Sequence, residues 1–410
     1  MEAAMKYPLA TGSWDDRERE AILRVIDSDR FTMGTVVAEF EQQFAEFFGA
    51  RHAVMSNSGS SANLLAIAAT LYRSQNALQP GDEVIVPAVS WGTTYFPLQQ
   101  HGLKLKFVDV SPTDFNLNVD QVEMAIGPNT KAIFAVNLLG VPCDFTRLAA
   151  ICDEHDLLLL EDNCESMGAK LHDKQCGTFG LAGTYSTFFS HHICTIEGGM
   201  TLTDDEELCQ IMRSLRSHGW TREPLPPHLT PTADSTSSDF HNLFRFALPG
   251  YNVRPNEIFA ALGQEQLKKL PSIVKGRQAN HDHLVARFAE FEKRNRGLLR
   301  IQSPQTRGTS ASWFGFAFVL SEYCVASRDA VVASLKANGI ECRPIVAGNF
   351  TRNPVMRYLD SSTHGSLDVA DSLHDRGFFV GNSHCDLSSS IDHLLDVLES
   401  ALTVSRREAA

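Results

Sequence analysis

Four consecutive leucines at 157–160, followed by Glu161 and Asp162, constrain the fold of this chain more than any other stretch. A strand that is apolar on both faces belongs to a sheet buried on both sides, and such sheets are mostly parallel. Other short apolar strands precede it at 53–56, 83–88, 105–110 and 132–137, with helical patterns between most of them. This alternation predicts right-handed crossovers and a large α/β domain with a mostly parallel sheet.

The remainder of the chain predicts helices around this sheet and a second, smaller domain. The 410 residues are too many for one ordinary core, so two domains are expected, at 1–272 and 273–410. From residue 312 on, strands mix with helices, which is typical of an α+β domain. A proline-rich segment at 221–239 predicts a long loop, either a functional flap or a mobile segment. Helices are expected at 14–28, 36–48, 60–71, 93–101, 145–155, 256–270, 273–294, 327–338 and 391–404, and C-terminal strands at 314–320, 341–345 and 377–380.

The overall composition restricts the class of protein. A net charge of −13 argues against a nucleic-acid-binding surface. No apolar run reaches the length of a membrane span, and the N-terminus lacks a signal-peptide pattern, so a cytoplasmic protein is expected. The nine cysteines form no Cys-x-x-Cys or Cys-x-Cys pair, which predicts reduced thiols and no compact metal motif.

Two candidate ligand-binding positions stand at the ends of predicted strands. Gly59 and Ser60 stand where a strand gives way to a helix, and a helix N-terminus binds phosphate through its free amides. An ordinary helix cap is the alternative, since serine is a favoured cap residue. Asp162 ends the leucine strand at the edge where parallel sheets place ligands, and a carboxylate there can keep a cofactor's pyridine nitrogen protonated. Glu161, Asp162 and Glu165 could also chelate a metal or form a solvated strand end.

A tryptophan and two histidines are further candidates. Trp91 follows the strand at 83–88, so its indole could stack on a flat ring, although a single tryptophan is more often a core residue. His191 and His192 are adjacent, so in extended backbone their side chains point to opposite sides and at most one faces a site directly. A histidine near neutral pKa suits proton transfer to and from carbon, although many loop histidines only bond to backbone.

The stretch at 186–200 joins these elements into a known pattern: an apolar strand, the histidine pair, and the turn Glu197-Gly198-Gly199. In these elements and their order the chain resembles the DegT/DnrJ/EryC/StrS sugar aminotransferases, pyridoxal enzymes with an aspartate aminotransferase-type fold. That family has a Ser-Phe-x-x-x-Lys motif whose lysine forms a Schiff base with the cofactor. Here His191, five residues after Ser186, stands at the lysine's place, and this exchange marks the family's sugar 3-dehydratases. The resemblance to that branch continues at 31–34, 86–91, 160–168, 218–222, 248–255 and 339–346.

The resemblance implies a role for each matching position. His191 would be the catalytic base. Arg254, His218 and Arg343 would be on the substrate side, with Arg254 reaching across a dimer interface. The cofactor would be held by Gly59, Ser60 and Ser186 at its phosphate, Trp91 on its ring, Asp162 at its nitrogen, Glu165 where many relatives have glutamine, and Asn252 from the other subunit of a homodimer.

The same resemblance implies the reaction. The expected enzyme binds pyridoxal or pyridoxamine phosphate without a covalent bond and removes the carbon-3 hydroxyl of a nucleotide-linked 4-keto-6-deoxyhexose, most closely a GDP-linked 6-deoxymannose. Glutamate would restore the amino group, and ammonia would be released. Alternatives are a sugar aminotransferase that uses Lys170 or Lys174, an inactive cofactor-binding homologue, and the CDP-sugar 3-dehydrase branch. That last branch shares the histidine but carries an iron–sulfur cluster, for which close-spaced cysteines are missing here.

Overall fold

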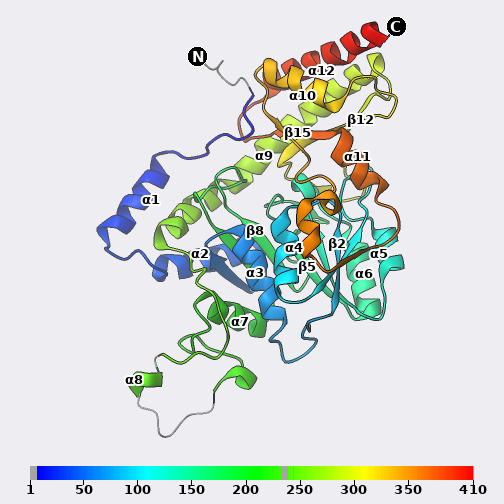
Figure 1. Cartoon of the computed structure of the whole chain (residues 1–410). Helices are drawn as coiled ribbons and strands as arrows, with labels where there is room; N and C mark the ends of the chain where they lie inside the picture. The colour runs from blue at the N-terminus through cyan, green and yellow to red at the C-terminus, as the bar shows by residue number, and fades with distance from the viewer. Residues whose placement is uncertain (1–6, 232–238, 243, 410) are drawn as a thin grey trace.

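The computed structural model describes residues 7–231, 239–242 and 244–409 and has a large eight-stranded sheet at its centre (Figure 1). Neighbouring strands from β8 to β14 run parallel, while β9 lies antiparallel between β1 and β8. The predicted α/β fold with a mostly parallel sheet is therefore confirmed. The strand order is β1 (His52–Ser56), β9 (Gly199–Thr203), β8 (Ala182–Ser186), β5 (Leu158–Asp162), β4 (Thr130–Val136), β2 (Glu83–Pro87), β3 (Lys104–Val108) and β14 (Ser361–Thr363).

Both faces of this sheet are buried, as the leucine run predicts. Leu160 packs into the core cluster on one face, whereas Leu159 belongs to the cluster on the other. Val84 and Ile85 of β2 divide in the same way, because successive side chains of a strand point to opposite faces. Helices cover the sheet: α3 (Gly59–Thr70), α4 (Gly92–Gln100) and α7 (Glu206–Arg216) contribute to the first cluster, α5 (Val119–Ala125) and α6 (Phe145–His155) to the second.

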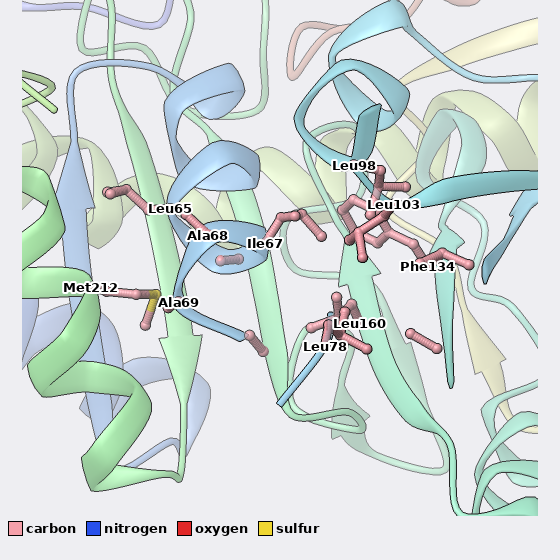
Figure 2. Packing of buried hydrophobic residues seen from close by; sticks show 14 of the residues in the cluster. Leu65, Ile67, Ala68, Ala69, Leu78, Leu98, Leu103, Phe134, Leu160 and Met212 are labelled. Carbon is pink, nitrogen blue, oxygen red and sulfur yellow. The ribbon is translucent and has the colours of Figure 1, made fainter. Parts of the chain in front are cut away.

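Figure 2 shows the first of these clusters around α3. The buried side chains of Leu65 and Ile67 on α3 extend to opposite sides of the helix, toward Met212 of α7 and toward the region of Leu98 and Phe134. A helix that is apolar on nearly every side is surrounded by protein. This burial fixes α3, and with it the position of its N-terminus at the edge of the sheet.

One helix, α9 (Glu257–Arg294), replaces the two helices expected at 256–270 and 273–294. It continues for 38 residues with Pro271 in its interior. An internal proline costs about 3 kcal/mol in helix stability because it removes a hydrogen bond. Leu270 and Ile273 are both buried in one apolar cluster on either side of the proline, and this packing keeps the helix continuous. The N-terminal helices α1 (Asp16–Asp27) and α2 (Thr35–Phe48) pack against its first half.

A smaller antiparallel sheet lies at the other end of α9, beneath α12 in Figure 1. Its own core is separate from that of the large sheet. The strand β14 leaves this region and pairs with β3 of the large sheet, and the predicted domain boundary at 272 falls inside α9. The division into two domains stays a prediction. The elements of this part are β10 (Leu299–Ile301), β12 (Gly315–Leu320), β15 (Gly377–Gly381), β13 (Cys342–Arg343), α10 (Arg328–Ala337), α11 (Asp368–Arg376) and α12 (Ser388–Ala409).

An arm between α7 and α9 extends away from the body at the lower left of Figure 1. It contains the short helices η2 (Pro227–Leu229) and α8 (Asp239–Asn242), and part of the loop predicted at 221–239 lies outside the described residues. Within the described residues, no helix is long and apolar enough to cross a membrane. Three short helices, η1 (Leu138–Gly140), η3 (Phe350–Arg352) and η4 (Pro354–Tyr358), and a ribbon of β6 (Lys170–Leu171), β7 (Lys174–Gln175) and β11 (Thr309–Ser310) complete the fold.

Candidate active site

The carboxyl ends of β1, β2, β4, β5 and β8 meet at one edge of the large sheet, around a cavity of ≈ 390 Å³. Ligands of α/β sheets bind at this edge. Seven of the predicted site residues line the cavity although they come from four different segments of the chain. They are Gly59, Ser60, Trp91, Asp162, Glu165, Ser186 and His191.

Asp162 is the last residue of β5 and is buried at the floor of the cavity. Three donors hold its carboxylate: Asn63 Nδ2 and the Thr94 hydroxyl, each 2.9 Å from Oδ2, and the Cys164 amide, 3.1 Å from Oδ1. A buried carboxylate costs several kcal/mol unless such donors satisfy it. The carboxyl oxygens of Asp162 are therefore held in place at the cavity, where they can accept a hydrogen bond from a ring nitrogen.

The N-terminus of α3 forms one wall of the cavity. Ser58 caps this helix by accepting a hydrogen bond from the Ser61 amide at 3.1 Å. An added Cβ at Gly59 would lie 2.6 Å from Ser186 Cβ, so only glycine lets α3 approach the end of β8 this closely. A Cβ at Gly199 would lie 2.1 Å from the Ser58 carbonyl oxygen, so close packing explains why the last residue of the Glu-Gly-Gly turn is glycine. Amides at such a terminus bind an anion such as phosphate.

Trp91 stands at the cap position of α4, four residues after the end of β2, and lines the cavity with 61% of its surface exposed. It is therefore not a core residue, in contrast to the alternative weighed from the sequence. Its indole is apolar surface available to the face of a flat ring.

His191 lies in the loop between β8 and β9 and lines the cavity, whereas His192 is 2% exposed and is absent from the cavity wall. The loop is bent here, with the His191 amide donating to the Phe188 carbonyl at 2.9 Å, so the alternation of an extended strand does not apply to this pair. The His191 ring contacts those of Phe188 and Phe314, at centroid distances of 5.9 and 5.2 Å. Burial, with a smaller effect of the Arg277 charge, lowers the pKa of His191 to about 4. The imidazole is thus neutral at neutral pH and can accept a proton.

Glu165 is the second ionisable group of interest on the cavity wall. Its Oε2 accepts a hydrogen bond from the Leu139 amide at 3.0 Å. Burial raises the pKa of Glu165 to about 7, and the neighbouring Asp162 charge adds to this effect. Near neutral pH this side chain is therefore divided between its charged and neutral forms, and its neutral form can donate a hydrogen bond into the cavity.

The other predicted residues do not line this cavity. Asn252 and Arg254 contact each other, with Arg254 Nε donating to Asn252 Oδ1 at 3.1 Å, and Arg254 lines a separate surface pocket with Trp220. His218 contacts the Trp220 ring at a centroid distance of 4.9 Å. Arg343 is exposed on β13 and pairs with the nearby Glu341. Their predicted roles depend on a neighbouring subunit or on substrate, neither of which is present in a single chain.

Sequence reasoning missed two residues that hold Asp162. Asn63 is buried in α3, where its Oδ1 also accepts a hydrogen bond from the Thr184 hydroxyl at 2.5 Å. A polar amide four residues into an otherwise apolar helix is a signal that could have been noticed. Thr94 gives no such signal, because a threonine in the first turn of a helix is ordinary. Glu197, recognised only as part of the turn motif, also lines the cavity.

The model of the DegT/DnrJ/EryC1/StrS aminotransferase family matches residues 13–391. The chain belongs to this family. It is 48% identical over 396 residues to GDP-4-keto-6-deoxy-D-mannose 3-dehydratase of Yersinia pseudotuberculosis, covering 96% of this chain and 98% of that protein.

Two solved structures of GDP-4-keto-6-deoxymannose-3-dehydratase are also similar to this chain. One contains a trapped PLP-glutamate geminal diamine, and the other is a histidine-to-asparagine variant with bound GDP-perosamine. Each is 46% identical, has a TM-score of 0.89, and covers 96% of this chain and 100% of that chain. The expected aminotransferase-type fold is thus confirmed by structural similarity.

The residues present fit pyridoxal phosphate, the cofactor that this family resemblance implies. Phosphate would bind at the α3 amides and Ser186, the ring would lie against Trp91, and the ring nitrogen would face Asp162. Gly59 permits the close approach of backbone that an anion site at a helix N-terminus needs. The three donors to Asp162 hold its carboxylate in place for a cationic ring nitrogen.

Replacing Gly59 with alanine is expected to weaken cofactor binding. The added methyl group must displace Ser186 or the start of α3, and overpacking of this kind costs about 1–3 kcal/mol. The dissociation constant of pyridoxal phosphate should therefore rise by about tenfold or more, as measured by absorbance titration. Gly12→Ala is the matched control, because a Cβ at Gly12 has no atom within 4 Å. Equal affinity in the two variants would contradict a role of Gly59 in the phosphate site at the start of α3.

Acid is expected to destabilise the wild-type apoprotein more than a His191→Asn variant. Because the pKa of His191 is lowered to about 4 in the folded state, only the unfolded chain protonates this ring between pH 6.5 and that value. The free energy of unfolding of the wild type therefore falls as pH falls through this window, by at most about 1.4 kcal/mol per pH unit. Urea unfolding of both proteins at several pH values measures the difference. A difference that does not change with pH would refute the lowered pKa.

Proposed function

We propose that this protein is a 3-dehydratase that converts a nucleotide-linked 4-keto-6-deoxyhexose, GDP-4-keto-6-deoxy-D-mannose, into the 4-keto-3,6-dideoxy sugar. One observation carries the proposal: a neutral histidine, and no lysine, is found among the residues that line the described cavity at the edge of the sheet. The family's aminotransferases hold their cofactor through a lysine, so a site with His191 in its place is suited to different chemistry.

Pyridoxamine phosphate, when bound, supplies an amino group for the sugar ketone and a ring that takes up an electron pair. The amides at the start of α3 and Ser186 would hold its phosphate, Trp91 would cover its ring, and Asp162 would keep its nitrogen protonated. These contacts would be the whole attachment, because no lysine that could bind it covalently is among the residues that line the cavity.

His191 performs the proton transfers. Its neutral imidazole would accept a proton from the cofactor carbon that bears the amino group. It would then donate a proton to the hydroxyl oxygen that departs from carbon 3 of the sugar. Glu197 and Glu165 line the same cavity. Loss of the hydroxyl is a two-electron reduction of the sugar, which the oxidation of glutamate to 2-oxoglutarate balances, with ammonia as the other product.

Support for the GDP sugar and for glutamate comes from the relatives. The related dehydratase binds GDP-perosamine in one structure and a PLP-glutamate adduct in another. A lysine-dependent aminotransferase is disfavoured, because Lys170 and Lys174 lie on the β6–β7 ribbon and neither lines the cavity. The Lys174 ammonium instead lies 4.7 Å from the centroid of the Phe179 ring.

The active form is a homodimer with shared sites. Asn252 and Arg254 lie outside the cavity of their own chain, although the Val253 carbonyl accepts a hydrogen bond from the Asn57 amide next to the α3 terminus. The segment thus passes near the phosphate end of the site while its side chains are directed elsewhere. A partner subunit would receive Asn252 at its phosphate site and Arg254 at its substrate.

Incubation of the protein with pyridoxal phosphate, glutamate and GDP-4-keto-6-deoxy-D-mannose should yield ammonia, 2-oxoglutarate and a 3-deoxy sugar in equal amounts. The same sugar linked to another nucleotide tests the choice of GDP. Formation of a 4-amino sugar without ammonia would identify an aminotransferase instead.

His191→Asn is expected to retain the cofactor and lose dehydration. The phosphate, ring and Asp162 contacts are unchanged, whereas loss of a general base lowers the rate by about 100- to 10,000-fold. Spectroscopic titration measures cofactor affinity, and release of ammonia measures turnover. His393→Asn is the control, because this histidine of α12 bonds to the Asn338 carbonyl and does not line the cavity. Wild-type turnover in His191→Asn would remove the basis of the mechanism.

Mixed dimers test the shared site. One subunit carries Asn252→Ala and Arg254→Ala, and the other carries Asp162→Ala, so each parent dimer is inactive. A mixed dimer restores one complete site if these residues act across the interface, and part of the activity should return. Mixed dimers that form, as shown by differently tagged subunits, but stay inactive would argue against sharing.

A further inference from the structure

Within the part of the chain that the structure describes, no hydrogen bond fixes the direction of the His191 ring. Among the described residues, its Nδ1 is buried without a partner. A histidine that transfers protons usually has its second nitrogen bonded to a carboxylate or a carbonyl, which sets both tautomer and ring orientation. The orientation of His191 must therefore come from the rings around it and from the backbone of its loop.

His192, the next residue, has the hydrogen bond that His191 lacks. Its Nε2 lies 3.1 Å from the Ser312 carbonyl oxygen. A carbonyl only accepts hydrogen bonds, so Nε2 carries the proton and Nδ1, buried without a partner, does not. Burial lowers the pKa of His192, in keeping with this neutral form.

The acceptor of this bond belongs to a firmly held segment at 312–314. The Ser312 amide donates to the Gly140 carbonyl and the Phe314 amide to the Leu139 carbonyl, both at 2.9 Å. The buried guanidinium of Arg277 donates to the Phe314 carbonyl at 3.0 Å. The segment is therefore fixed both to the loop after β4 and to α9, independently of the histidine loop.

The ring of Phe314 in that segment contacts both histidines. Its centroid lies 5.2 Å from that of His191 and 6.0 Å from that of His192. The segment thus holds His192 by a hydrogen bond and supports the ring of His191 from the side.

We propose that His192 is a positioning residue: its bond to the Ser312 carbonyl fixes the loop so that the His191 ring stays packed against Phe188 and Phe314 with Nε2 toward the cavity. The inference rests on the proposed role of His191 as the base. A displacement of about 1 Å in a reacting group can lower a rate about 100-fold, so one buried hydrogen bond is enough to matter for turnover.

Two substitutions separate positioning from bulk packing. His192→Phe keeps a ring but removes the donor, and kcat is expected to fall about 10- to 100-fold while KM for the sugar and cofactor affinity are retained. His192→Gln places an amide donor at a similar reach and should restore most of kcat. The control is His393→Phe, which removes another histidine donor to a carbonyl, Asn338, away from the cavity. Equal loss in His192→Phe and His192→Gln, or none in His192→Phe, would overturn the proposal.

A second readout does not depend on turnover. Diethyl pyrocarbonate modifies neutral imidazoles, and mass spectrometry of the full-length protein gives the rate at His191 alone. The rate should rise several-fold in His192→Phe, because the ring becomes mobile and both nitrogens become reachable, and stay near wild type in His192→Gln. If the wild type does not dehydrate the sugar, the proposed function fails, whereas an unchanged modification rate refutes positioning by itself. Phe314→Leu, expected to raise the same rate, replaces His192→Phe if that variant does not fold.

Discussion

The buried carboxylate of Asp162 is the interaction on which the site depends. It ends the central strand β5 and accepts hydrogen bonds from Asn63 of α3 and Thr94 of α4. An unsatisfied charge at this depth would cost several kcal/mol, so the two helices are held where their donors reach it. Because α3 begins at Gly59 and α4 follows Trp91, holding these two helices also fixes the positions of the α3 amides and of the Trp91 ring.

The loop that carries His191 is held by parts of the chain that lie far apart in sequence. The Trp14 indole donates to the Cys194 carbonyl at 2.9 Å, and Gln266 of α9 accepts from the Cys194 amide at 3.0 Å. His192 attaches the loop to Ser312, next to the smaller sheet. The N-terminal segment, α9 and the C-terminal part of the chain thus all determine where one imidazole lies. Irregular backbone is precise here because its polar groups are paired with buried partners.

Desolvation gives the cavity its chemical character. Burial lowers the pKa of His191 and raises that of Glu165, so both shifts favour the uncharged forms. A neutral base beside a fixed aspartate suits proton removal from carbon next to a cationic ring. A lysine at the same place would bind the cofactor covalently, whereas a histidine can move protons without holding it.

The sequence by itself indicated five strands of the large sheet, most helices and the residue types of the site, but not the edge strand β14. Unbroken apolar strands predict burial on both faces, and Asp162 and Gly59 follow strand ends, so their place at one edge could be inferred. It did not predict that α9 continues through Pro271, because packing of Leu270 and Ile273 outweighs a local helix-breaking tendency. The resemblance named His191 as the base, but the residue pattern alone could not show how the two adjacent rings are placed, since alternation in an extended strand says only that they differ. That placement was decided by the bend at Phe188 and by the Ser312 carbonyl, 120 residues away, which binds one ring and leaves the other to the cavity. Contacts of this kind arise only when distant segments are folded together, so only the tertiary structure could decide them.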